Sequence, residues 1–131
     1  MSERPHATPG SRGRLARSFG YAFRGIGMLV RTQPNAQIHA GATVLAVAAG
    51  IWLDISRREW CAVIGAIGLV WTAEGVNTAI EATVDLISPE THPLAAQAKD
   101  VAAGAVLCAA LAALVIGALV FGPRVWAMLP A

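Results

Sequence analysis

Four polar residues in the middle of the chain have the types and the spacing to do chemistry. They are Glu74, Asn77, Glu81 and Asp85, at intervals of three and four residues. On an α-helix such residues lie within about 60° of the first of them and form one polar stripe. A carboxylate at the centre of a membrane costs at least ~2.5–3.5 kcal/mol and is normally kept for function, and Mg²⁺ takes carboxylate oxygens as ligands. The spacing alone leaves open a polar clamp between helices, an ion or proton pathway, and a catalytic site.

A second polar cluster, with His92 and the adjacent pair Lys99 and Asp100, immediately precedes a long uncharged segment. A lone lysine there would simply extend its amine to the membrane surface. Acids for a divalent ion, bases for phosphates and an aromatic ring for a nucleotide base are together the groups that phosphoryl transfer needs. The chain has neither a Gly-x-x-x-x-Gly-Lys-Ser/Thr loop nor a Gly-rich kinase loop. Any nucleotide site is therefore expected on a fold other than that of the soluble kinases.

Long apolar segments must position these residues. Of the 131 residues, 56% are hydrophobic and 14% are charged, against about 25% charged in an average soluble domain. This composition excludes a disordered chain and argues against a soluble globule. Tryptophans stand at segment ends, as in aromatic belts. We predict an all-α membrane protein with transmembrane helices at about 36–54, 58–86 and 97–122.

The N-terminal segment has a different pattern. Residues 1–31 hold six arginines and one glutamate, and residues 12–32 place the apolar side chains opposite the arginines on a helix. A helix of this kind lies in the membrane interface, and its charge predicts a cytoplasmic N-terminus. The arginines are too few and too confined for nucleic-acid binding. We therefore expect a disordered tail at 1–11, a surface helix at 12–32 and a single membrane domain over 12–131, which forms oligomers because three spans barely enclose a core.

The polar residues sit in a specific sequence context. The run Glu74-Gly-Val-Asn77-Thr-Ala-Ile-Glu81-Ala-Thr-Val-Asp85, with His92-Pro93-Leu94 and Ala98-Lys99-Asp100, resembles the small prokaryotic diacylglycerol kinase/undecaprenol kinase family. The likeness runs from about Arg14 to Gly122. It implies a homotrimeric enzyme of the bacterial inner membrane, with one surface helix and three transmembrane helices per subunit. It also implies that neighbouring subunits share sites for a lipid alcohol and MgATP.

The resemblance also implies roles for individual residues. Glu74 would be the general base for the lipid hydroxyl, Asn77 would lie against the γ-phosphate and the base, and Glu81 would hold the metal. The nucleotide would meet Arg14, Tyr21, Lys99 and Asp100, with Asp85 and His92 at polar positions nearby. Where the family usually has a second metal-binding glutamate, this chain has Gln33. We expect weaker or displaced Mg²⁺ binding, because the amide keeps an oxygen but loses the charge.

Two short runs in the sequence bear on which lipid is the substrate. The run Asn35-Ala-Gln-Ile-His39-Ala and the run Thr91-His92-Pro93-Leu94 resemble the undecaprenol kinase branch more than the diacylglycerol branch. We expect a kinase that transfers the γ-phosphate of ATP to undecaprenol or diacylglycerol, for phospholipid recycling or the supply of a cell-envelope lipid carrier. The alternative is a catalytically silent membrane oligomer, or a small-ion pathway, that keeps the polar stripe.

Overall fold

Four helices make up the computed structural model, which describes residues 11–90 and 92–128. They are α1 (Ser11–Thr32), α2 (Pro34–Trp52), α3 (Arg57–Ile87) and α4 (Pro93–Met128). The predicted all-α fold is confirmed. Of the predicted disordered tail, residues 1–10 lie outside the described residues, as do Thr91 and residues 129–131.

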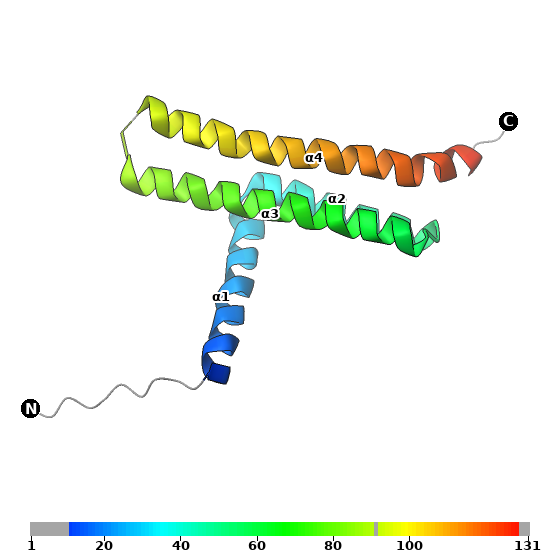
Figure 1. The fold of residues 1–131 in the computed structure, drawn as a ribbon, viewed down its shortest axis with the longest axis horizontal. Coiled ribbons are helices and arrows are strands. Elements are labelled where there is room, and N and C mark those ends of the chain that lie inside the picture. The colour runs from blue at the N-terminus through cyan, green and yellow to red at the C-terminus, as the bar shows by residue number, and fades with distance from the viewer. Residues whose placement is uncertain (1–10, 91, 129–131) are drawn as a thin grey trace, which may run out of the picture.

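The helices α3 and α4 form a long antiparallel pair, and α2 lies along α3 (Figure 1). Helix α1 runs away from the other three at a steep angle. The connection between α3 and α4 is short, since α4 begins at Pro93, four residues before the start that the polar composition of this region suggests. Proline is well suited to the first turn of a helix because its missing N–H would have no helical partner there. Lys99 and Asp100 consequently lie in the second turn of α4 and not in its first turn.

A single residue separates α1 from α2. Gln33 has an extended backbone, with φ −106° and ψ 115°, and Pro34 follows it as the first residue of α2. Proline disfavours helical geometry in the residue before it, so the break falls at Gln33. This break turns the amphipathic α1 away from the axis of α2.

At the end away from the α3–α4 turn, where α3 begins and α4 ends, the two helices are held together by apolar packing and by paired charges. Ser56 and Glu59 form a capping box at the start of α3, in which each side chain binds the backbone N–H of the other. Arg124 of α4 reaches Glu59 through hydrogen bonds of 2.6 and 2.8 Å. Ile55, Val63 and Val120 form a buried apolar cluster beside them. We refer to this end as the closed end.

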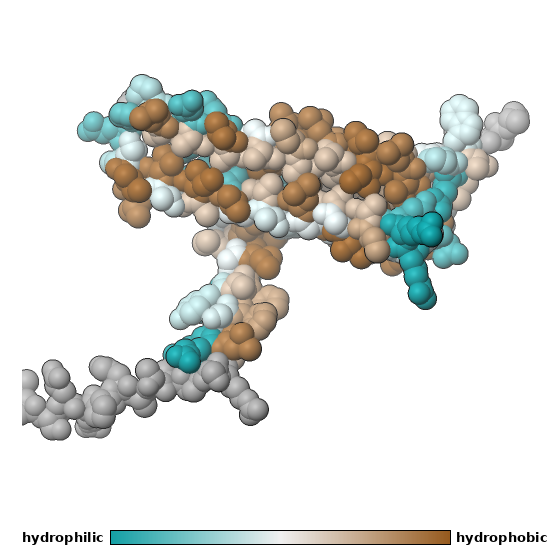
Figure 2. Space-filling view, in the orientation of Figure 1, coloured by the Kyte–Doolittle hydropathy of each residue, from teal (hydrophilic) through white to brown (hydrophobic). Residues whose placement is uncertain are grey.

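Two of the described helices, α3 and α4, are long and apolar enough to cross a membrane. The 31 residues of α3 extend about 46 Å, which exceeds the ~30 Å hydrocarbon thickness. Hydrophilic residues gather at both ends of the α3–α4 pair and apolar residues cover the surface between them (Figure 2). Helix α2 is shorter, at 19 residues, and begins with several polar side chains, so the count of three transmembrane helices stays a prediction.

Candidate active site

The polar stripe of α3 passes from the interior of the chain to its surface. Glu74 is 1% exposed and Asn77 is 5% exposed. Glu81 is half-buried, and Asp85 near the end of the helix is exposed. Because the four residues share one helix face, a ligand bound at the end of α3 could extend along the stripe toward Glu74.

Three buried polar atoms of α3 lack a hydrogen-bond partner among the described residues. They are Glu74 Oε2, Asn77 Oδ1 and Thr78 Oγ1. Unpartnered buried polar atoms are uncommon and each costs about 1–3 kcal/mol. Three of them within five residues mark the part of the chain that a ligand or a neighbouring molecule would complete.

Asn77 connects the buried and the exposed parts of the stripe. Its Nδ2 donates a hydrogen bond to Glu81 Oε1 over 3.1 Å, which leaves its unpartnered Oδ1 for another group. The carboxylate of Glu81 and the amide oxygen of Asn77 are both hard donors of the kind that Mg²⁺ prefers. Within the described residues no three acidic, histidine or cysteine side chains gather into a complete metal site. The oxygens therefore fit a Mg²⁺ ion that takes its other ligands from phosphates and water.

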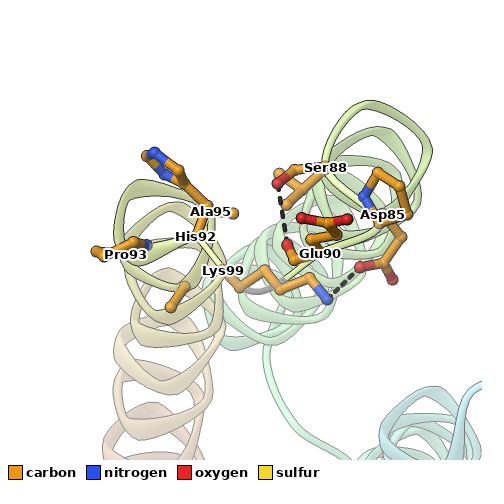
Figure 3. A pocket seen from close by; sticks show the side chains of 10 residues that line it. Asp85, Ser88, Glu90, His92, Pro93, Ala95 and Lys99 are labelled. Carbon is orange, nitrogen blue, oxygen red and sulfur yellow. Dashed lines mark hydrogen bonds and ion pairs between the residues drawn. The ribbon is translucent and has the colours of Figure 1, made fainter.

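A cavity of about 520 Å³ lies at the turn between α3 and α4. Lys99 reaches across it and donates a hydrogen bond of 2.5 Å to Asp85 Oδ1 (Figure 3). His92 lies on the α4 side with its ring turned away from this pair, and its Nδ1 accepts a hydrogen bond from the backbone N–H of Leu94. Asp100, the residue after Lys99, is exposed on α4. The structure thus brings Asp85, His92 and Lys99 to one cavity, open to a solvent molecule or ligand.

The two predicted nucleotide-binding residues of α1 lie elsewhere. Arg14 and Tyr21 are exposed, and α1 carries them away from the α3–α4 turn (Figure 1). The ring of Tyr21 instead lies beneath the guanidinium of Arg24, 4.8 Å from its centroid, in a cation–π contact. One chain therefore does not bring Arg14 and Tyr21 together with Lys99.

Gln33, the candidate metal ligand before α2, is half-buried. Helices α2 and α3 contact each other between His39 and Glu74 and between Thr43 and Trp71. Because the two helices are antiparallel with equal rise per residue, continuing this register puts Gln33 at the level of residues 80 and 81. This level is that of Glu81.

An apolar groove of about 600 Å³ runs between α1 and α3. Its α3 wall includes Thr72 and Gly75, which lie on either side of Glu74 in the sequence, while Glu74 itself is not among the lining residues. The groove is lined by Ala22, Gly25, Ile26, Met28, Leu29, Thr32, Trp71, Thr72, Gly75, Thr78, Ala79 and Ala82. A hydrocarbon chain could lie in this groove with its polar end near Glu74.

His39, whose Nε2 lies 3.9 Å from Glu74 Oε2, is a neighbour of the site that was not predicted from the sequence. A histidine in a segment that otherwise has no charge, on the helix that precedes the acidic stripe, was the available signal. The register between α2 and α3, which makes the two side chains neighbours, could not be predicted from periodicity.

Comparisons with known proteins were consistent with the arrangement of these residues. The sequence model of the family described as prokaryotic diacylglycerol kinase matches residues 20–121. An undecaprenol kinase of Bacillus subtilis is 44% identical over 111 residues, which cover 85% of this chain and 90% of that protein. A diacylglycerol kinase of Synechocystis is 40% identical over 101 residues, 76% of this chain and 58% of that protein. A diacylglycerol kinase of Escherichia coli is 33% identical over 102 residues, 78% of this chain and 84% of that protein.

Proposed function

Because the chain belongs to the prokaryotic diacylglycerol kinase family and is a membrane lipid kinase that uses ATP, we propose that Glu74 is the base that activates the lipid hydroxyl. The observation that carries this proposal is the unpartnered Oε2 of a carboxylate that is 1% exposed. A free carboxylate oxygen beside an apolar groove can accept a proton from an alcohol whose hydrocarbon chain stays in the groove. The alternative of a silent oligomer or an ion pathway has no support in the comparisons, since the relatives are named as kinases.

The reaction requires one proton transfer and one exchange of phosphorus–oxygen bonds. Glu74 Oε2 takes the hydroxyl proton, and the lipid oxygen forms a bond to the γ-phosphorus of ATP. The bond between that phosphorus and the bridging oxygen breaks, and ADP leaves with the bonding electron pair. Asn77 would hold the γ-phosphate against the base through the second N–H of its Nδ2, since the first N–H is donated to Glu81, and Glu74 later releases its proton to water.

The negative charge of the ATP phosphates would be neutralised by basic side chains of α1 and α4. Lys99 and Arg14 would pair with phosphate oxygens, and Tyr21, Asp85, His92 and Asp100 would surround the rest of the nucleotide. Glu81 and Gln33 would hold Mg²⁺, which supplies further positive charge next to the phosphates. In support of this assignment, Asn77 orients Glu81 and Gln33 lies at the level of Glu81 on the neighbouring helix.

We propose undecaprenol as the preferred lipid. The supporting observations are the runs around His39 and His92 and the 44% identity to an undecaprenol kinase, against 33% to a diacylglycerol kinase of Escherichia coli. The test is a kinase assay with γ-labelled ATP and Mg²⁺ in mixed vesicles that hold undecaprenol or diacylglycerol. Label on undecaprenol at ten times the rate on diacylglycerol, or more, would support the proposal. The reverse preference would overturn the assignment of the lipid, and label on neither lipid would overturn the lipid kinase itself.

The enzyme is further proposed to be a homotrimer of the bacterial inner membrane. Its N-terminus and the α3–α4 turn would face the cytoplasm, and α2, α3 and α4 would each cross the membrane, consistent with the arginines of α1. The separation of Arg14 and Tyr21 from Lys99 supports sites that combine α1 of one subunit with α3 and α4 of the next.

Mixing two inactive chains tests this shared site. An Arg14→Ala chain and a Lys99→Met chain, reconstituted together, would form some interfaces in which both residues are intact. Random assembly predicts roughly a quarter of the wild-type turnover in the equimolar mixture. A mixture as inactive as each variant alone would show that one subunit supplies the whole site.

A further inference from the structure

We propose that His39 is a positioning residue that holds the carboxylate of Glu74 in the orientation needed to accept the proton of the lipid hydroxyl. The proposal rests on the proposed function, because it assigns His39 a part in the same proton transfer. His39 acts through Glu74 and does not touch the nucleotide.

The two side chains face each other between α2 and α3. His39 Nε2 lies 3.9 Å from Glu74 Oε2, and the two side chains are 16% and 2% exposed. One helical turn further along α2, Thr43 Oγ1 accepts a hydrogen bond of 3.0 Å from Trp71 Nε1 of α3. Thr43 also donates to the backbone oxygen of His39 over 2.7 Å. The first of these hydrogen bonds is a second contact between α2 and α3 and the second lies within α2, so neither involves the side chain of His39 or of Glu74.

A buried carboxylate needs a compensating group. Among the described residues, His39 is the basic side chain that comes within 4 Å of Glu74. At 3.9 Å the imidazole does not form a hydrogen bond, so Oε2 is still free. His39 therefore restricts the orientation of the carboxylate by its position and by electrostatic attraction over 3.9 Å, and it leaves Oε2 without a hydrogen bond for the lipid hydroxyl.

The acid at the closed end has a different kind of partner, one that only bonds the two helices together. Glu59 is held by Arg124 on both of its oxygens, at 2.6 and 2.8 Å, and has no oxygen left for a ligand. The looser contact of His39 is suited to a carboxylate that must exchange its partner during turnover. Asp85 lies eleven residues beyond Glu74, about 16 Å along α3, and Lys99 of α4 is paired with it, so the substitution of His39 should leave the KM for MgATP unchanged.

The test compares two amide variants that differ in length. His39→Gln keeps an N–H donor near the position of Nε2, whereas His39→Asn stops short of it, and His39→Leu removes the donor. Each variant is compared with the wild-type enzyme in vesicles that hold undecaprenol, with Mg²⁺ and saturating ATP. We expect kcat to be about 10–100-fold below the wild-type value in His39→Leu and in His39→Asn, because such a loss is typical of removing a group that orients a reacting residue. His39→Gln should keep kcat within about fivefold of wild type, and the KM for MgATP should stay within about twofold in all three.

Thr43→Val is the matched control. It removes the hydrogen bond between Thr43 of α2 and Trp71 of α3 and leaves the side chains of His39 and Glu74 in place. It should lower the midpoint of thermal unfolding as much as His39→Leu and leave kcat near the wild-type value. Full kcat in His39→Leu would overturn the proposal, as would equal losses in the Gln and Asn variants or an equal kcat loss in Thr43→Val. Inactive wild-type enzyme would instead overturn the proposed function, so the two failures are distinguishable.

Discussion

The acids of the two ends of α3 differ in how their oxygens are used. At the closed end, Glu59 is bound by Ser56 and by both terminal nitrogens of Arg124, next to a buried apolar cluster. In the second half of the helix, Glu74 is more deeply buried and yet keeps an oxygen without a partner. A helix that needed only stability would pair both acids, because an unpartnered buried polar atom costs free energy. The difference shows that the closed end is bound by paired charges and supports the proposal that the Glu74 end is kept open for chemistry.

The largest expected effect follows from removing the base. Glu74→Gln keeps the size of the side chain but removes its ability to take a proton, so kcat should fall by about 10²–10⁴-fold. The oligomer should have the same size as the wild type by light scattering in detergent. Wild-type turnover would remove Glu74 from the role of base, and a dissociated oligomer would support a structural role for its carboxylate.

Removing a phosphate-binding charge should have the next largest effect. Lys99→Met keeps the apolar stem but removes the amine that spans the cavity at the α3–α4 turn. We expect kcat/KM for MgATP to fall by about 10–100-fold, since the positive charge is needed most when the phosphoryl group is in transfer. Asp85→Asn is the matched comparison, because it breaks the same ion pair and leaves the lysine. An equal loss in Asp85→Asn would assign the effect to the ion pair and contradict direct contact of Lys99 with phosphate.

Restoring a carboxylate at the break between α1 and α2 should improve metal binding. Gln33→Glu adds a charge at the level of Glu81, so the Mg²⁺ concentration for half-maximal turnover should fall roughly two- to tenfold. Gln37→Glu, with the same change one turn along α2, should leave that concentration unchanged. No change in Gln33→Glu would place Gln33 outside the metal site, and equal changes in both variants would attribute the effect to general charge.

Close packing at the closed end predicts an effect on stability alone. A Cβ added at Gly50 would come within 2.7 Å of the indole of Trp60 and 3.1 Å of Ile55 Cδ1. Gly50→Ala should lower the free energy of unfolding by about 1–3 kcal/mol through overpacking, with kcat unchanged. Gly41→Ala on the same helix, where a Cβ meets nothing within 4 Å, is the control and should not destabilise the chain. Equal stability of the two variants would show that the closed end is loosely packed.

Periodicity in the sequence was sufficient to predict the helices and the stripe, because residues three and four apart share a helix face wherever the helix packs. It was insufficient for contacts between helices. His39 and Glu74 are 35 positions apart and Glu59 and Arg124 are 65 apart, so their meeting depends on the register of packed helices. The early start of α4, at Pro93 and not at about residue 97, was missed for a different reason, since the polar connection before residue 97 is typical of a loop but proline is equally suited to the first turn of a helix.

The most direct test makes the same substitution at both acids of α3 and measures turnover and thermal unfolding in the same vesicles. Glu74→Gln should lower labelling of the lipid by γ-labelled ATP about 10²–10⁴-fold and leave the unfolding midpoint at the wild-type value. Glu59→Gln should lower the midpoint by a few degrees, because it weakens the contact with Arg124, and leave labelling intact. Lipid labelled at the wild-type rate by Glu74→Gln would contradict the central claim that the unpartnered carboxylate oxygen is the base.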